Sequence, residues 1–87
     1  MKIELGKRYI NAGGTVVKII SDIVDSPFYD YEGCNGLSYT KKGRFSRIYI
    51  TQSDLICEVN DRLYELYLTE QISKKYFLLE HINLWSK

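Results

Sequence analysis

The apolar pattern of this chain changes its period at Asn60. Before that point, short runs rich in β-branched and aromatic residues are separated by turn residues every few positions, which is typical of short strands. After it, polar residues recur at helical spacing, and Asn60 or Asp61 can cap a helix. We therefore expect a single α+β domain, with strands over residues 1–59 and a helical extension over residues 60–87 that packs on them.

Five or six strands are expected in the first part of the chain. The candidate segments are residues 7–10, 15–24, 28–31, 37–40, 44–50 and 55–59. Gly13 and Gly14 provide a hairpin turn between the first two segments, and the second segment is expected to bend near Ser21. Exposed edges in so small a sheet would promote aggregation, so the strands are expected to close on themselves. The pattern predicts a small, strongly bent SH3-like β-barrel.

The core of the predicted barrel follows from alternation along these strands. Its expected members are Tyr9, Val17, Ile19, Phe45, Ile48 and Leu55. Because side chains alternate between the two faces of a strand, Phe45 and Ile48 can both point inward only if the strand bulges. Alternation also places Leu55, Cys57 and Val59 on one face, with Cys57 as a small buried hydrophobe.

The predicted C-terminal helix is apolar around most of its circumference. A surface helix on a small barrel needs an apolar stripe of only about 100°, whereas here the polar residues form the narrow stripe. The positions expected to bind a partner are Leu68, Ile72, Leu79, Ile82 and Trp85. In an alternative interpretation, residues 63–68 form a further strand and a shorter helix runs from Glu70 to Trp85.

This surplus of apolar helix surface implies a protein partner. Monomers rarely expose large apolar patches, so the helix is expected to meet either a second copy of the chain or a target protein. A homodimer through paired helices is the simplest arrangement, because a two-fold axis lets one apolar strip cover itself. Trp is a common interface anchor, so we expect Trp85 to contact the partner.

Charged and aromatic residues define a second candidate surface. The acids of residues 22–32 fall in a stretch without bases, and the bases of residues 41–47 fall in a stretch without acids. The candidate docking or nucleic-acid patch comprises Tyr39, Lys41, Lys42, Arg44, Arg47 and Tyr49. The simpler interpretation is a solvated rim with intramolecular pairs. The formal net charge of +1 argues against nucleic acid, because phosphate contacts dominate that affinity.

The sequence contains no catalytic constellation. Cys34 and His81 could form a nucleophile–base pair, but no third group is present to orient them. The paired Cys and His spacings of a zinc site are absent, and two cysteines do not make a disulfide framework. We therefore expect no enzyme activity, no metal and no cofactor. Without a signal peptide or a long apolar run, we expect a cytoplasmic protein that does not enter the membrane.

Residues 1–59 contain five short motifs with the residues of turns and strands, one after another along the chain. They are Leu5-Gly6-Lys7-Arg8-Tyr9-Ile10, Gly13-Gly14 with the Val-rich run after it, Pro27-Phe28, the run from Tyr39 to Phe45, and Asp54-Leu55. In these motifs the chain resembles a group of small proteins that tailed bacteriophages make early in infection. The resemblance implies an N-terminal SH3-like β-barrel in a setting of host-takeover and anti-defence factors, and it supplies no catalytic residues.

The sequence and the resemblance together lead to one functional expectation. It is a non-enzymatic phage protein that binds a host protein and inhibits or redirects it, with anti-defence as one such role. The apolar helix face would block the target, and the charged loops of the barrel would orient it. Two alternatives stay open at this point, namely a small barrel that binds nucleic acid and a self-assembling structural component of the phage.

Overall fold

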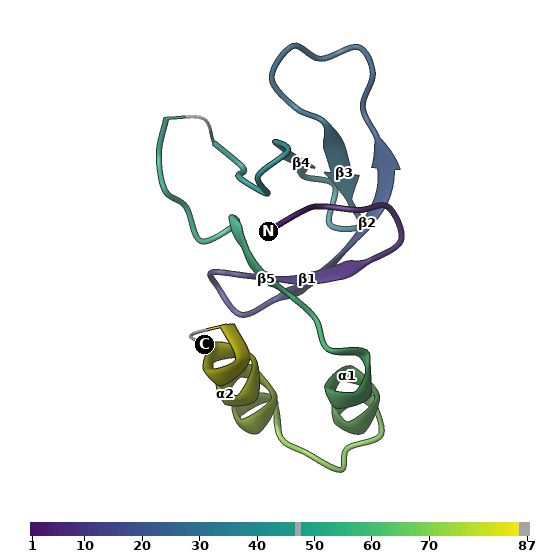
Figure 1. Ribbon diagram of the computed structural model, residues 1–87, viewed down its shortest axis with the longest axis vertical. Coiled ribbons are helices and arrows are strands. Elements are labelled where there is room, and N and C mark those ends of the chain that lie inside the picture. The colour runs from purple at the N-terminus through teal and green to yellow at the C-terminus, as the bar shows by residue number, and fades with distance from the viewer. Residues whose placement is uncertain (47, 86–87) are drawn as a thin grey trace.

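The protein is a curled antiparallel sheet with two helices at one end (Figure 1). The computed structural model describes residues 1–46 and 48–85, with side chains as far as residue 83 in the last helix. The elements are β1 (Arg8–Asn11), β2 (Val16–Asp22), β3 (Tyr31–Gly33), β4 (Ser38–Tyr39), β5 (Leu55–Glu58), α1 (Asp61–Leu68) and α2 (Lys74–Trp85). The expected small α+β, barrel-like fold is confirmed.

The five strands form one sheet in the order β4-β3-β2-β1-β5. Every neighbouring pair is antiparallel. A turn rather than a strand connects the two edges of the curl: Thr40 N–H donates to Arg44 O at 2.9 Å, and Leu55 N–H donates to Gly43 O at 2.8 Å. These bonds satisfy backbone groups that an open edge would expose. The sheet is therefore a half-barrel whose gap the 40–44 turn covers.

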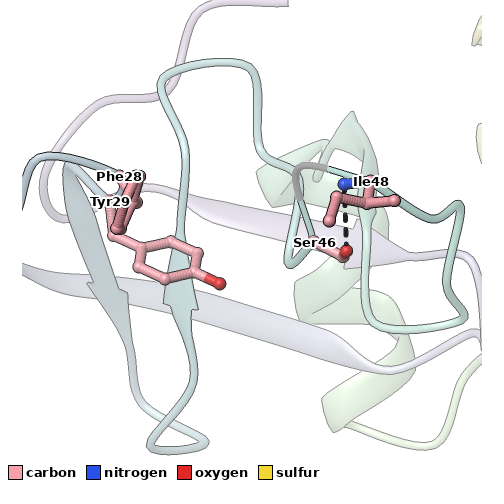
Figure 2. A pocket seen from close by; sticks show the side chains of 4 residues that line it. All are labelled: Phe28, Tyr29, Ser46 and Ile48. Carbon is pink, nitrogen blue, oxygen red and sulfur yellow. Dashed lines mark hydrogen bonds between the residues drawn. The ribbon is translucent and has the colours of Figure 1, made fainter.

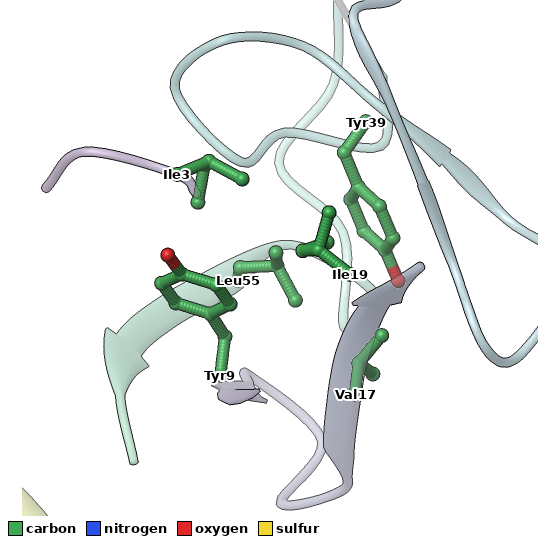
Figure 3. Packing of buried hydrophobic residues seen from close by; sticks show 6 residues of the cluster. All are labelled: Ile3, Tyr9, Val17, Ile19, Tyr39 and Leu55. Atoms are coloured by element: carbon green, nitrogen blue, oxygen red, sulfur yellow. The ribbon is translucent and has the colours of Figure 1, made fainter. Parts of the chain in front are cut away.

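The inside of the curl holds the first of two apolar clusters (Figure 3). Its buried members are Ile3, Tyr9, Val17, Ile19, Tyr39 and Leu55. The hydroxyl of the fully buried Tyr9 accepts from Glu4 N–H at 2.8 Å and donates to Lys2 O at 3.1 Å. These bonds allow the polar end of the ring to lie inside a core. Four of the predicted core residues lie in this cluster, and Phe45 packs against it half-buried.

The second apolar cluster lies between the sheet and the helices and contains Ile10, Cys57, Val59 and Phe77. Leu55 and Cys57 are both buried, as predicted, but they belong to different clusters. The reason is a bulge: Ile10 pairs with Cys57 while the next residue, Asn11, pairs with Leu55, so that Ile56 is extra. An extra residue turns the following side chains to the other face, and one strand therefore contributes to both clusters.

Two of the predicted strands are wrong. Residues 28–30 form a loop before β3, and the described part of residues 44–50 is also a loop. Side-chain oxygens take the N–H groups that a strand ladder would need. Asp54 accepts from Phe45 N–H at 2.8 Å, and Ser46 Oγ accepts from Tyr49 N–H at 3.1 Å. Ile48, predicted in the core, consequently lies in this loop with 79% of its surface exposed.

The helical region is divided into two helices rather than one. Residues 63–68 are helical, so the alternative of a further strand there is wrong. The helix ends in a Schellman motif, in which Glu70 N–H donates to Tyr67 O at 3.1 Å and Gln71 N–H donates to Leu66 O at 2.9 Å. Glu70 has a φ of +61°, which turns the chain away from the helix axis. The helix, which was expected to be single or nearly continuous, therefore breaks between residues 68 and 74.

Candidate functional site

The predicted docking or nucleic-acid patch does not assemble as a base-stacking platform. Tyr39 is wholly buried, and its hydroxyl accepts from Asn35 Nδ2 at 2.9 Å, so it cannot stack on a base. Arg44 donates from Nη2 to Tyr49 O at 3.0 Å, which engages its guanidinium within the loop. Lys41 and Lys42 are exposed. Arg47 lies outside the described residues.

The predicted partner-binding positions of the helical region are in different environments. Leu68 at the end of α1 is 60% exposed, whereas Ile72 is half-buried against the second cluster. On α2, Leu79 and Ile82 are 48% and 47% exposed. The side chain of Trp85 lies outside the described part of the chain, so its predicted contact with a partner stays a prediction.

The inner side of α2 attaches the helix to the sheet. Phe77 is 1% exposed, and its ring lies 5.0 Å from that of Tyr67 and 4.4 Å from that of His81, measured between centroids. His81 is 2% exposed, and its Nε2 accepts from Asn60 N–H at 2.8 Å. Because Nε2 accepts, the proton is on Nδ1, which donates to Phe77 O at 2.8 Å. His81 thus links α2 to the residue that caps α1.

The opposite side of α2 faces water. Its residues are Lys75, Tyr76, Leu79, Ile82 and Asn83, which we call the α2 outer face. Leu79 is at its centre, since the helical repeat of 3.6 residues places Tyr76, Ile82 and Asn83 on either side of it. The large apolar members are each about half exposed. When a short helix is apolar on both sides, only one side can be buried against its own sheet, and the other side stays exposed.

The first turn of α2 carries an unusual charge arrangement. Lys74 and Lys75 are both exposed there, and no acidic residue accompanies them. The N-terminus of a helix carries partial positive charge, so cations at that position are unfavourable by a few tenths of a kcal/mol up to about 1 kcal/mol. Ser73 compensates in part, because its Oγ accepts from Tyr76 N–H at 3.1 Å. The electrostatic interaction of the two lysines would be more favourable with an acidic surface than with the N-terminus of their own helix.

A second surface, not foreseen from the sequence, lies between two loops. Phe28 and Tyr29 form one side and Ser46 and Ile48 the other side of an open groove of about 470 Å³, which we call the loop groove (Figure 2). The sequence does contain a signal for it. Each loop has the pattern serine, any residue, an apolar residue and tyrosine, at residues 26–29 and 46–49. Because polar and apolar residues also alternate in these segments, the sequence predicts strands there instead.

The serine of each pattern fixes the loop that follows it. Ser26 Oγ accepts from the N–H groups of Phe28 and Tyr29, both at 3.1 Å. Ser46 Oγ does the same for Ile48 and Tyr49, at 3.2 and 3.1 Å. Serine favours such local turns because its hydroxyl competes with secondary structure for backbone N–H groups.

The structure does not bring the two candidate catalytic residues together. Cys34 lies in the turn after β3, where its Sγ accepts from Lys18 N–H at 3.3 Å, while both ring nitrogens of His81 are engaged with Asn60 and Phe77. Cys57 is buried, and burial raises the pKa of its thiol. Within residues 1–46 and 48–85, no three His, Cys, Asp or Glu side chains are grouped so that they could hold a metal ion.

The comparisons with known proteins gave no relative. No protein-family model matches the chain, and neither a curated protein nor a solved structure matches it. The resemblance to early phage proteins therefore stays a prediction that rests on the motifs of residues 1–59. In the part of the chain that the structure describes, no helix has the length and apolar character needed to cross a membrane.

Proposed function

We propose that this chain is a non-enzymatic binding protein that docks on another protein through the α2 outer face. The observation that carries the proposal is the exposure of Tyr76, Leu79 and Ile82 at 49%, 48% and 47%. These side chains stay exposed to water although Phe77 and His81, on the other side of the same helix, are buried. Amphipathic helices that dock in a partner's groove present apolar anchors at this spacing of three or four residues.

The lysines indicate the chemistry of the partner surface. Lys74 and Lys75 begin the same helix, and Lys75 lies on the α2 outer face. A partner groove with acidic residues at its rim would relieve the unfavourable interaction of these cations with the helix N-terminus. The proposed partner is therefore a protein with an apolar groove and an acidic rim.

The biological setting of the proposal comes from the motif resemblance. We propose a phage protein in the cytoplasm of an infected bacterium, which inhibits or redirects a host protein by covering the surface that this protein uses. Burial of Tyr39 weighs against the alternative of a nucleic-acid platform. A role as a structural component of the phage has no specific support from the described surfaces.

The test begins with capture from a bacterial lysate and continues with the captured protein in purified form. Binding of the intact chain is measured by calorimetry and compared with binding of the Leu79→Ser variant. Loss of a central apolar anchor should weaken binding about 30-fold, the equivalent of about 2 kcal/mol. Lys75→Glu should also weaken binding, and the effect should shrink as salt is added.

Ile20→Ser is the matched control, because it removes an apolar side chain of similar exposure, 55%, from β2 rather than from α2. It should leave the affinity unchanged. The proposal is wrong if Leu79→Ser binds the purified partner as tightly as the natural chain does. It is also wrong if Ile20→Ser alone abolishes binding, because the sheet would then be the docking surface.

A further inference from the structure

The two loops that line the loop groove, before β3 and before β5, run on the side of the sheet away from α1 and α2 (Figure 1). The volume of the groove, about 470 Å³, is in the range of sites that hold a ligand or a partner's side chains. The same two loops carry three more apolar side chains that are strongly exposed, namely Val24 at 86%, Tyr49 at 70% and Ile50 at 89%. Neither apolar cluster of the fold contains them, and such a concentration is typical of an interaction surface.

Hydrogen bonds within the chain fix the two sides of the groove. Tyr29 donates from its hydroxyl to Phe45 O at 2.9 Å and thereby joins the two loops. The serine turns described above fix the backbone at Phe28 and Ile48 on either side (Figure 2). A preformed surface loses little conformational freedom on binding, so a modest contact area can be sufficient for association.

Exposed charges of both signs lie in the two chain segments that lead into the loops of the groove. Asp22 and Asp25 are exposed on the side of the first loop, and Lys41 and Lys42 are exposed on the turn that follows β4. A hydrogen bond of 3.1 Å from Lys41 N–H to Asp30 Oδ2 shows that the two segments adjoin.

These acids and bases are not paired with one another. Among the described residues, the ion pairs are those of Lys7 with Glu4 and Glu58, at 2.6 and 3.0 Å. The intramolecular pairing that the sequence allowed therefore does not account for the separation of charge between the two segments. The charges of both segments are available to another molecule.

We propose that a second copy of this chain covers the loop groove in a two-fold symmetric dimer. In the proposed arrangement the acidic segment of one copy lies against the basic segment of the other, and the two-fold axis forms this contact twice. The exposed Val24 and Ile50 side chains of each copy then lie against Phe28 and Ile48 of the other. With a net charge of +1, two copies repel each other only weakly.

This dimer differs from the helix-paired dimer expected from the sequence, and it does not depend on the proposed function. It leaves the α2 outer face of both copies open. Two such faces on one particle would increase the avidity for a partner that is itself oligomeric.

Sedimentation of the full chain over a wide range of concentrations tests the proposal. At low salt the average mass should rise from 10.2 kDa toward twice that value as concentration increases. Ile50→Ser and Ile48→Ser should each raise the dissociation constant about 10-fold. Both side chains are largely exposed, so the circular dichroism and the unfolding midpoint of these variants should equal those of the natural chain. Leu79→Ser, on the α2 outer face, is the control and should dimerise normally.

Charge reversal gives a second, independent measurement. A variant with Asp22→Lys and Asp25→Lys replaces the exposed acids of the first segment by bases, and one with Lys41→Glu and Lys42→Glu replaces the exposed bases of the second segment by acids. Each alone should sediment as a monomer, and an equal mixture of the two should recover the dimer mass. Added salt should weaken the mixed dimer more than the natural one.

Three results would overturn the proposal. The first is a mass of 10.2 kDa at every concentration up to the solubility limit. The second is a dimer that Leu79→Ser disrupts and Ile50→Ser does not, since the helices would then form the interface. The third is failure of the two charge-reversed variants to associate when mixed, although each is folded.

Discussion

At the scale of single residues, the Asp54 carboxylate organises the loop that precedes it. It accepts from Phe45 N–H at 2.8 Å, from Thr51 N–H at 3.0 Å and from the Thr51 hydroxyl at 3.0 Å. Burial alone would disfavour the charge, but the hydrogen bonds from Thr51 and Phe45 outweigh it and lower the pKa of Asp54 below its ordinary value of 3.8. The ionised form therefore stabilises the folded state.

We predict that Asp54→Asn lowers the free energy of unfolding at pH 7 by about 1–3 kcal/mol, because backbone N–H groups lose a charged acceptor. The folded pKa lies below the unfolded one, so the contribution is complete above pH 3.8 and disappears as the pH falls through the folded value. Urea unfolding as a function of pH measures both effects. Asp25→Asn, at an exposed site, should change neither, and an unaltered acid dependence in Asp54→Asn would contradict the assignment.

The two thiols should differ strongly in reactivity. Cys34 is exposed, whereas Cys57 is buried and its pKa is raised by that burial, so little reactive thiolate forms at neutral pH. A colorimetric thiol reagent should modify one cysteine rapidly in the folded protein and the second only in denaturant. Cys34→Ser should remove the rapid phase. Equal rates for both thiols in the folded protein would show that Cys57 is accessible.

At the scale of elements, the backbone at the junction of α1 and α2 is strained at one residue, and a substitution there can relieve the strain. Glu70 occupies the left-handed position of the Schellman motif, which glycine adopts at lower cost than any residue with a Cβ. Glu70→Gly should therefore raise the free energy of unfolding by about 0.5–1 kcal/mol, even though glycine also makes the unfolded chain more flexible. The midpoint of urea unfolding measures the change.

Glu65→Gly provides the matched comparison for this prediction. Glu65 is also an exposed glutamate, but it lies inside α1, where glycine costs about 1 kcal/mol. The two substitutions should shift the unfolding midpoint in opposite directions. If both destabilise the protein equally, the junction does not have the positive φ described above.

At the scale of the whole molecule, the helices are part of the fold rather than an appendage. The second cluster joins Ile10, Cys57 and Val59 of the sheet to Phe77 of α2. We predict that a chain ending at Val59 does not fold stably, because it would expose this face of the sheet to water. Circular dichroism and amide chemical-shift dispersion would show the loss. A cooperative unfolding transition in that fragment would show that residues 1–59 form an independent unit.

The expected unfolding of a chain that ends at Val59 limits how binding by the helices can be tested. Binding by the helical region cannot be tested by deleting it, since a loss of binding would follow from unfolding. Substitutions on the α2 outer face avoid this problem, because Leu79 contributes about half of its surface to solvent and does not belong to either buried cluster.

By itself, the sequence determined the local character of the chain: extended before Asn60, helical after it, with turns at the glycines and a buried apolar set around Tyr9, Val17 and Ile19. These properties depend on neighbouring residues and on alternation, which a sequence displays directly. The end of α1 was also local, but its left-handed residue is a glutamate rather than the glycine that usually signals it.

Only the tertiary structure decided the rest. Residues 44–50 have the composition of a strand, but Asp54, just before β5, takes the N–H group of Phe45, and this outcome depends on where β5 lies. The bulge at Ile56 assigned Leu55 and Cys57 to different clusters. One half-barrel can cover only part of the apolar surface of α2 and the loops. That limit decided which of their apolar side chains are exposed. Contacts between distant segments set these features, so no local pattern encodes them.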